Sequence, residues 1–315
     1  PLFRYTKKDL CIFSSETISI RHIVSCALDL DSISEWRLIR RPMLGKTFFN
    51  EIEEILPGTV LKNNKLLYNI PKSSNKNEIF SQESIFNNLK DSVEKHQLSD
   101  VKYVSLLSGG IDSSIITAFS DCKKTYSVGL PKNNEFKAAE ETSLQLSKPI
   151  NCVVVQPEMI LEIWKKLINL KGEPLFLPNE ALIYSVCKAM DIDEKVILTG
   201  EGADELFFGY DKIFRWAKES TDFSIDKFLI KYCYSDLKYL TKILLENLEI
   251  MKEDKTPIEF VEDFFFNYHL PCLLRRMDFS SMAASKEARV PFVTNKLFSI
   301  AYRADPDKKI DENLS

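Results

Sequence analysis

VKYVSLLSGGIDSS, residues 101–114, runs from a compact apolar segment into two glycines and three serines. Residues 101–107 predict a buried strand, and residues 113–119 predict a helix directly after it. Glycine is needed where the backbone takes a positive φ or approaches a ligand closely, and a helix N-terminus attracts anions. Residues 108–114 therefore predict a phosphate site. Taken alone, they also fit an ordinary strand-to-helix turn capped by serine.

The alternation of strand and helix continues along the chain. Strand-like runs occur at residues 125–128, 152–155 and 196–198, and helical patterns at residues 137–146, 159–170 and 180–190. Strands separated by helices predict right-handed crossovers and an α/β fold with a doubly wound parallel sheet. Ligands bind at the carboxyl ends of the strands in such sheets. Six of the nine glycines follow the predicted strands: Gly109, Gly110, Gly129, Gly200, Gly202 and Gly209.

A second glycine-bearing turn follows the strand at residues 196–198. It reads TGEGADELFFGY, residues 199–210, and holds three carboxylates within five residues. Acidic residues often cap a helix N-terminus, but one cap needs neither three acids nor two glycines. Mg²⁺ that bridges phosphates takes one or two carboxylates, and Asp112 with Asp204 would supply one from each turn. Neither turn is a Walker A loop or a dinucleotide fingerprint.

The chain has a different pattern on either side of residues 72–80. Residues 1–71 contain short β-type runs, a partly helical stretch within residues 23–38, and a hairpin formed by residues 59–61 and 66–68. The polar residues 71–77 predict a linker. We therefore predict an N-terminal segment at 1–71, a linker at 72–80 and the α/β domain at 81–315, whose part after Asp211 is mostly helical.

Composition excludes several classes of function. The 42 Lys and Arg residues against 46 Asp and Glu residues give a formal charge of −4, which predicts neither nucleic-acid nor membrane binding. No apolar run approaches the ~18 residues of a membrane span. The seven scattered cysteines are typical of buried thiols in a cytoplasmic protein, and the three histidines show no zinc-ligand spacing.

These residues resemble the asparagine synthetase superfamily, which also includes β-lactam synthetases and lasso-peptide cyclases. Four ordered motifs carry the resemblance: the pyrophosphate loop at residues 108–114, an adenine-pocket strand at 126–130, the second signature at 199–210 and a further signature at 280–292. The resemblance implies a synthetase domain of the glutamine-dependent, class B type. It also implies an α/β fold of the adenine nucleotide alpha hydrolase-like (PP-loop) type.

The resemblance implies a reaction in which a substrate carboxylate attacks the α-phosphate of ATP. An acyl-adenylate and pyrophosphate result, and ammonia or an amine then displaces AMP. Glu201 matches the glutamate beside the acyl-adenylate, where it would assist adenylation or accept a proton, and Asp112 and Asp204 would hold Mg²⁺. The ATP-binding residues that the resemblance implies are Leu106, Ser108, Gly109, Gly110, Asp112, Ser113, Ser114, Val128, Thr199 and Gly200.

The acceptor site is less specific in the sequence. Residues 173–180 and the helix that holds Tyr184 resemble the segment that lines the acceptor pocket, so Asn179, Glu180 and Tyr184 are the candidates. Asn179 is also a candidate N-cap of that helix. Aspartate is the default small-molecule carboxylate, while a sugar acid, a peptide or an antibiotic precursor would suit the same chemistry.

Residues 1–71 resemble the closing strands of the family's glutaminase domain, without its N-terminal cysteine. We therefore expect no glutaminase activity from this chain, and nitrogen from ammonia or from a glutaminase domain or subunit. The family's phosphate-binding lysine has no match, because Lys308 and Lys309 come too early. The chain is then a fragment, or a companion chain completes the site in a homodimer or heteromer. An ATP-dependent amide-forming ligase that works with ammonia or a partner glutaminase is one interpretation of its function. A non-catalytic nucleotide-binding homologue, or the structural half of a heteromeric amidotransferase, is the other.

Overall fold

The computed structural model describes residues 1–62, 65–69, 80–233 and 236–310. The chain forms two compact units. The first contains Pro1–Ser73, Lys171–Phe176 and Asp211–Cys272, and the second contains Ser74–Leu170, Leu177–Tyr210 and Leu273–Ser315. The sequence-based division places residues 171–176 and 211–272 in the second domain, whereas the structure groups them with the first. One reason is that the turn η1 (Leu237–Tyr239) contacts helix α2 (Leu30–Ile39). The predicted linker lies outside the described residues except for Phe80.

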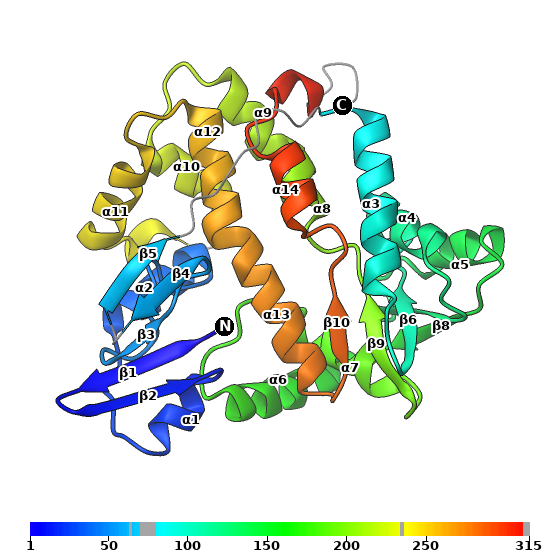
Figure 1. The fold of residues 1–315 in the computed structure, drawn as a ribbon, viewed down its shortest axis with the longest axis horizontal. Coiled ribbons are helices and arrows are strands. Elements are labelled where there is room, and N and C mark those ends of the chain that lie inside the picture. The colour runs from blue at the N-terminus through cyan, green and yellow to red at the C-terminus, as the bar shows by residue number, and fades with distance from the viewer. Residues whose placement is uncertain (63–64, 70–79, 234–235, 311–315) are drawn as a thin grey trace. The chain divides into compact units, whose positions relative to one another are not determined.

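The second unit is built on a five-stranded parallel sheet. Its strands are β6 (Lys102–Leu106), β7 (Thr125–Gly129), β8 (Ile150–Val154), β9 (Glu194–Leu198) and β10 (Glu287–Arg289). Their order across the sheet is β10-β9-β6-β7-β8. Figure 1 labels these strands, except β7, from orange β10 to green β8. All paired strands are parallel. The predicted α/β fold with a parallel sheet is confirmed, and each of the four strands predicted from the sequence is present.

The strand order reverses between β6 and β9. From β6 the chain moves through β7 to β8 on one side, then returns to add β9 and β10 on the other. Because crossovers are right-handed, the reversal puts helices on both faces of the sheet, as in doubly wound folds. A crevice opens at such a reversal, at the carboxyl ends of the two central strands. The two glycine-bearing turns follow β6 and β9, so this topology brings them to the same edge.

Some helices of the second unit begin with a side-chain cap and others begin without one. Helix α3 (Gln82–His96) is capped by the Ser81 side chain, which accepts the Ser84 N–H at 3.1 Å. Helix α4 (Ile111–Phe119) starts after Gly110 with no side-chain cap. The others are α5 (Phe136–Gln145), α6 (Pro157–Lys171), α7 (Glu180–Ala189), α8 (Ala203–Phe207), α13 (Leu270–Met282), α14 (Asn295–Ala301) and the 3₁₀ turn η3 (Pro306–Lys308). Helices α6 and α13 end or begin in the first unit.

The first unit contains an antiparallel sheet of order β2-β1-β3, formed by β1 (Phe3–Lys7), β2 (Leu10–Ser14) and β3 (Ile52–Glu54). The predicted hairpin is present as β4 (Thr59–Lys62) and β5 (Lys65–Asn69), and the centre of its turn lies outside the described residues. The helices are α1 (Thr17–Arg21), α2, α9 (Asp211–Glu219), α10 (Ile225–Tyr232), α11 (Lys242–Lys252), α12 (Pro257–Phe264) and the π-helical stretch η2 (Phe265–His269). Aromatic side chains of α9, α10, α12 and η2 pack together in its interior, including Phe214, Phe228, Phe264 and Phe265.

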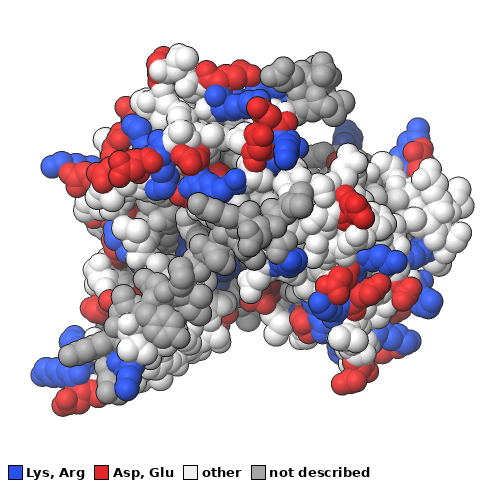
Figure 2. Space-filling model, turned by 45° about the horizontal axis from the view of Figure 1, so that its top comes forward, with Lys and Arg blue, Asp and Glu red and all other residues white. Residues whose placement is uncertain are grey.

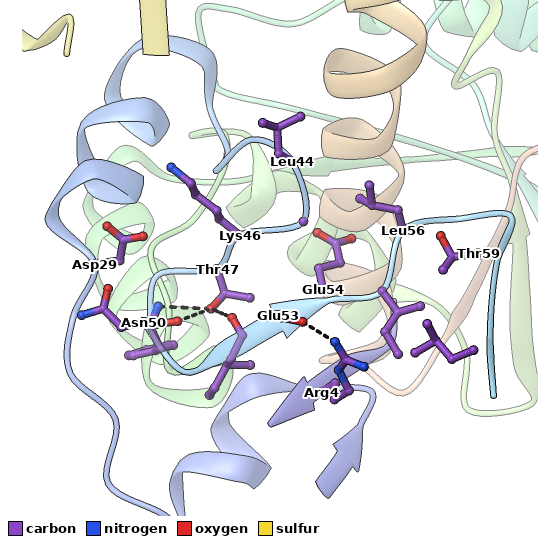
Figure 3. A pocket seen from close by; sticks show the side chains of 15 residues that line it. Arg4, Asp29, Leu44, Lys46, Thr47, Asn50, Glu53, Glu54, Leu56 and Thr59 are labelled. Carbon is purple, nitrogen blue, oxygen red and sulfur yellow. Dashed lines mark hydrogen bonds and ion pairs between the residues drawn. The ribbon is translucent and has the colours of Figure 1, made fainter. Parts of the chain in front are cut away.

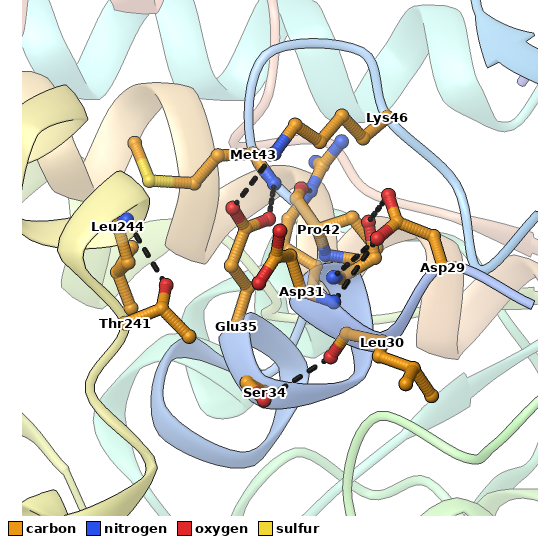
Figure 4. A network of polar contacts seen from close by, with 12 residues as sticks. Asp29, Leu30, Asp31, Ser34, Glu35, Pro42, Met43, Lys46, Thr241 and Leu244 are labelled. Carbon is orange, nitrogen blue, oxygen red and sulfur yellow. Dashed lines mark hydrogen bonds and ion pairs between the residues drawn. The ribbon is translucent and has the colours of Figure 1, made fainter. Parts of the chain in front are cut away.

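The first unit also contains a hollow of about 530 Å³. Arg4 and Glu53 form an ion pair of 2.6 Å in its wall, and Lys46 and Asp29 line it on another side (Figure 3). Next to it, the fully buried carboxylate of Glu35 accepts the Met43 N–H at 2.8 Å and pairs with Lys46 at 3.2 Å (Figure 4). Burial raises the pKa of Glu35, while Met43 and Lys46 act in the opposite direction.

The surface has mixed charge. On the face that Figure 2 shows, basic and acidic side chains of the described residues are interspersed, as expected from a formal charge of −4. Within the described part of the chain, no helix has the length and apolar character needed to cross a bilayer.

Candidate active site

The two predicted signatures are in direct contact. Gly200, in the turn after β9, lies against the backbone of Asp112 and Ser113 at the start of α4. A Cβ atom placed on Gly200 would lie 2.8 Å from the Ser113 nitrogen and 2.9 Å from the Asp112 carbonyl carbon. Only glycine allows the two turns to approach this closely. The structure thus brings residues 108–114 and 199–210 together at the switch point of the sheet.

Helix α4 presents free donors at this edge. Within the described residues, the backbone N–H groups of Ile111, Asp112 and Ser113 have no acceptor, since the first intrahelical bond runs from Ser114 to the Gly110 carbonyl at 3.1 Å. Donors at a helix N-terminus, together with the helix dipole, favour an anion. The turn that carries them fits a phosphate group.

The serine hydroxyls of this turn hold its shape. Ser113 Oγ accepts the Ser108 N–H at 3.1 Å and lies 3.0 Å from Ser108 Oγ. Ser114 Oγ donates to the Gly110 carbonyl at 2.7 Å. Ser108 also accepts the Gly110 N–H at 3.3 Å, through its own hydroxyl. The hydroxyls therefore fix the loop before any ligand enters.

A hollow of about 480 Å³ opens on the outer side of this loop. Gly109, at φ 87°, lies against the first turn of α5, where a Cβ would be 2.7 Å from the Ala139 nitrogen. The positive φ and the close approach both require glycine. The hollow is lined by Ser108, Gly109, Gly110, Asn134, Glu135, Lys137, Ala138 and Glu141.

The two candidate metal ligands influence each other electrostatically. Burial raises the pKa of Asp112 to about 6, and the negative charge of Asp204 adds to the rise. Asp204 is exposed as a residue, but partial burial of its carboxyl group still raises the pKa of that group. Two carboxylates that repel each other are favoured to bind a cation between them. Within the described residues, no group of three or more His, Cys, Asp and Glu side chains could hold a metal.

A third carboxylate of the second signature has a structural partner. Glu205 is buried and accepts the Tyr210 hydroxyl at 2.7 Å. Burial raises the pKa of Glu205 to about 7, and the charges of Glu201 and Asp204 contribute to the rise. Glu205 thus ties the middle of the signature to its last residue, Tyr210, and its side chain is buried.

The predicted adenine contacts lie on one face of the sheet. Leu106 on β6 is in register with Tyr126 on β7, and Val128 is two residues further along β7. Side chains in register on neighbouring strands, and those two residues apart, point to the same face. Thr199 is buried at the end of β9, and its Oγ1 accepts the Glu201 N–H at 3.4 Å. The roles of these residues toward ATP stay predictions.

The acceptor segment is organised differently from the sequence-based expectation. Asn179 occupies the N-cap position of α7, but its side chain makes no capping hydrogen bond. Instead the carboxylate of Glu180 accepts the Leu177 N–H at 3.1 Å. The side chain of Asn179 turns to Arg276, whose Nη1 donates to it at 3.3 Å. Asn179 is therefore the N-cap residue of α7, as one of the two interpretations predicts, but its side chain contacts Arg276 and makes no capping hydrogen bond.

Two side chains of α6, one lysine and one tryptophan, hold the rest of this segment through hydrogen bonds. Lys166 on α6 donates to the Tyr184 hydroxyl at 2.6 Å. Trp164, also on α6, donates its indole N–H to the Pro178 carbonyl at 2.9 Å. Helix α6 thus fixes both the start of α7 and the third predicted acceptor residue.

Arg276 is the site residue that the sequence analysis missed. It lies on α13, is only 6% exposed, and forms an ion pair with Glu201. The guanidinium therefore contacts the predicted catalytic glutamate as well as Asn179. A signal was present, because Arg275 and Arg276 follow the apolar residues 270–274 and come shortly before the signature at residues 280–292.

Comparison with known proteins gives the family. The sequence description of the family "Asparagine synthase" matches residues 85–315. The glutamine-hydrolyzing asparagine synthetase 1 of Bacillus subtilis (strain 168) is 29% identical over 225 residues, which cover 67% of this chain and 36% of that protein. Asparagine synthetase B of Escherichia coli (strain K12) is 27% identical over 255 residues, covering 71% and 38%.

Similarity extends over the first unit in one further relative. A Methanocaldococcus jannaschii protein is 25% identical over 331 residues, covering 99% of this chain and 53% of its own length. The chain thus spans between about a third and about half the length of these curated relatives. Among solved structures, the glutamine-dependent NAD⁺ synthetase from Acinetobacter baumannii in complex with ADP has a TM-score of 0.31 at 15% identity, covering 70% of this chain and 48% of that one, and we draw nothing from it.

Proposed function

We propose that this chain, which belongs to the asparagine synthase family, carries the ATP-dependent part of an amide-forming ligase. A substrate carboxylate would attack the α-phosphorus of ATP, breaking the bond to the pyrophosphate and forming an acyl-adenylate. Ammonia or an amine would then attack the acyl carbon and release AMP. Aspartate is the default acceptor, because the named relatives are asparagine synthetases.

One observation supports the proposal most directly. Gly200 lies against Asp112, so the turns after β6 and β9 share one edge of the sheet. The uncapped N-terminus of α4 offers donors for the departing pyrophosphate. The carboxylates of Asp112 and Asp204 supply the hard oxygen ligands that Mg²⁺ prefers. Mg²⁺ would neutralise negative charge on the phosphates.

Glu201 would act on the acceptor side of the site. Its carboxylate lies beside the Asn179 segment through their shared partner Arg276. A carboxylate in this place could orient the acyl group or take a proton from the attacking amine. The hollow in the first unit contains no residue of the two signatures, so we assign it no part in this chemistry.

Release of pyrophosphate tests the proposal. The chain is mixed with ATP, Mg²⁺ and aspartate, with and without ammonia, and pyrophosphate and AMP are measured. We expect pyrophosphate from the wild type in both mixtures and free AMP when ammonia is present. We expect neither product from Asp112→Asn, and wild-type amounts from Asp100→Asn, which removes an exposed carboxylate outside the signatures. ATP binding without release of pyrophosphate, with all candidate acceptors present, would favour the non-catalytic homologue.

A further inference from the structure

Arg276 joins two parts of the second unit that are far apart in the sequence. Its Nη2 pairs with the carboxylate of Glu201 in the turn after β9, and its Nη1 donates to the side-chain oxygen of Asn179 at 3.3 Å. The side chains of Arg276 and Glu201 are 8% and 14% exposed. One guanidinium therefore holds the second signature and the start of α7 in a fixed relation.

Stability alone does not explain a charge pair in this place. Removing two charges from water costs free energy that their attraction often fails to recover, and well-packed apolar residues do as well or better. A planar guanidinium, however, has donors in a rigid fork, which fixes the direction of each acceptor. Arg276 is thus better suited to set geometry than to stabilise the fold.

Arg276 also keeps one donor for a further group. Its Nε–H is buried and has no protein acceptor within the described residues. A buried donor without an acceptor costs about 1–3 kcal/mol, so proteins rarely leave one away from a functional site. This donor belongs to the guanidinium that contacts both Glu201 and Asn179, which connects Arg276 to the acceptor side.

We infer that Arg276 is a positioning residue, which fixes the Glu201 carboxylate and the Asn179 side chain as one unit against the acceptor. The inference rests on the proposed function, since it assigns a role within the same reaction. Loss of the fork would leave ATP binding intact, because neither contact of Arg276 involves the turn after β6. It would lower the rate of adenylation, since Glu201 would no longer be held in place.

The test compares two substitutions of Arg276 with a matched control. Arg276→Gln removes the charge and Arg276→Lys keeps the charge without the fork. Arg41→Gln breaks an ion pair that is buried more deeply still, Arg41 with Glu54 at 2.8 Å in the first unit, which contains neither signature. Each protein is assayed for ATP affinity by calorimetry, for kcat and KM of pyrophosphate release, and for thermal stability.

We expect Arg276→Gln to lower kcat about 100-fold, the loss typical of a misplaced catalytic group, with ATP affinity unchanged. Arg276→Lys should recover part of the rate. Arg41→Gln should lower stability and leave the kcat of the folded protein unchanged.

Three outcomes would overturn the inference. One is a wild-type kcat in Arg276→Gln. If that variant does not fold, a wild-type kcat in folded Arg276→Lys has the same meaning. The third is an equal loss of kcat in Arg41→Gln, which would show that the rate follows stability. If the wild type releases no pyrophosphate, the proposed function is wrong and the inference falls with it. If the wild type is active and the Arg276 variants are equally active, the inference alone is wrong.

Discussion

Gly209 lies so close to Asp204 that no side chain fits between them. A Cβ atom on Gly209 would be 1.9 Å from Asp204 Oδ1, well inside the contact distance of the two atoms. The Gly209 N–H also donates to the Asp204 carbonyl at 2.9 Å. The signature at residues 199–210 thus folds back on itself, and its last glycine sets the direction of the Asp204 carboxylate.

Gly209→Ala should therefore impair the metal site more than the fold. The new methyl group must push the Asp204 side chain aside, at a stability cost of about 1–3 kcal/mol. We expect the Mg²⁺ concentration needed for half-maximal pyrophosphate release to rise several-fold. A titration of activity with Mg²⁺ measures this, and an unchanged titration would show that Asp204 does not bind the ion.

Gly200→Ala should separate the two turns. The methyl group would meet the backbone of Asp112 and Ser113 at 2.8–2.9 Å, and backbone atoms cannot move as a flexible side chain can. We expect ATP binding to weaken by at least about tenfold, equivalent to 1.4 kcal/mol, while the second unit stays folded. Calorimetry with a non-hydrolysable ATP analogue checks the affinity, and circular dichroism checks the fold. Unchanged affinity would mean that the phosphates bind elsewhere.

Asp112→Asn should abolish the reaction without lowering the stability of the ligand-free protein. Without a cation, Asp112 and Asp204 repel each other, and the pKa of Asp112 is raised to about 6 by burial and by this repulsion. Removal of one charge relieves the repulsion. We expect the Tm without ligand to be equal to or higher than that of the wild type, and the rise in Tm on adding Mg²⁺ and ATP to be lost. A lower Tm without ligand, together with a normal response to Mg²⁺ and ATP, would contradict the metal-site assignment.

The sequence predicted the second unit well, because its pattern is local. Strands such as β6 and β9 are short apolar runs, and the glycines after them mark turns whose chemistry depends on a few adjacent residues. The parallel direction of the strands then follows from the crossovers. The adjacency of β6 and β9 does not, so the expectation that the turns of Asp112 and Gly200 meet rests on the two glycine-bearing turns and on the family resemblance.

The contacts of α13 could not be foreseen in this way. Arg276 reaches Glu201 and Asn179 over 75 and 97 positions of sequence, and no local periodicity reports such a distance. The side chain of Asn179 could not be placed from the sequence for the same reason. An asparagine before a helix predicts a side-chain cap, whereas here the side chain accepts a hydrogen bond from the distant Arg276. The grouping of residues 211–272 with the first unit likewise depends on long-range packing, such as the contact between η1 and α2.

Glu35→Gln should change how the stability of the protein depends on pH. Burial raises the pKa of Glu35, so the folded protein holds this proton more tightly than the unfolded chain, whose glutamates titrate near about 4.3. As the pH rises from that value through the raised folded pKa, the folded state loses stability, because the unfolded state ionises more easily. Glutamine keeps an acceptor for the Met43 N–H but cannot ionise, so the variant lacks this loss.

The quantity to measure is the free energy of unfolding of Glu35→Gln minus that of the wild type, from urea titrations at several pH values. We expect this difference to increase as the pH rises above about 4.3 and to level off once Glu35 is ionised in the folded wild type. The Lys46 ion pair forms only when Glu35 is ionised, so its effect is already contained in the pKa of Glu35. Differences between glutamine and glutamate that do not depend on pH shift the whole curve without changing its slope. Glu53→Gln, at an exposed carboxylate paired with Arg4, should give a nearly flat difference. A difference that falls with rising pH would mean that Lys46 and Met43 outweigh burial, and that the folded protein favours the charged form of Glu35.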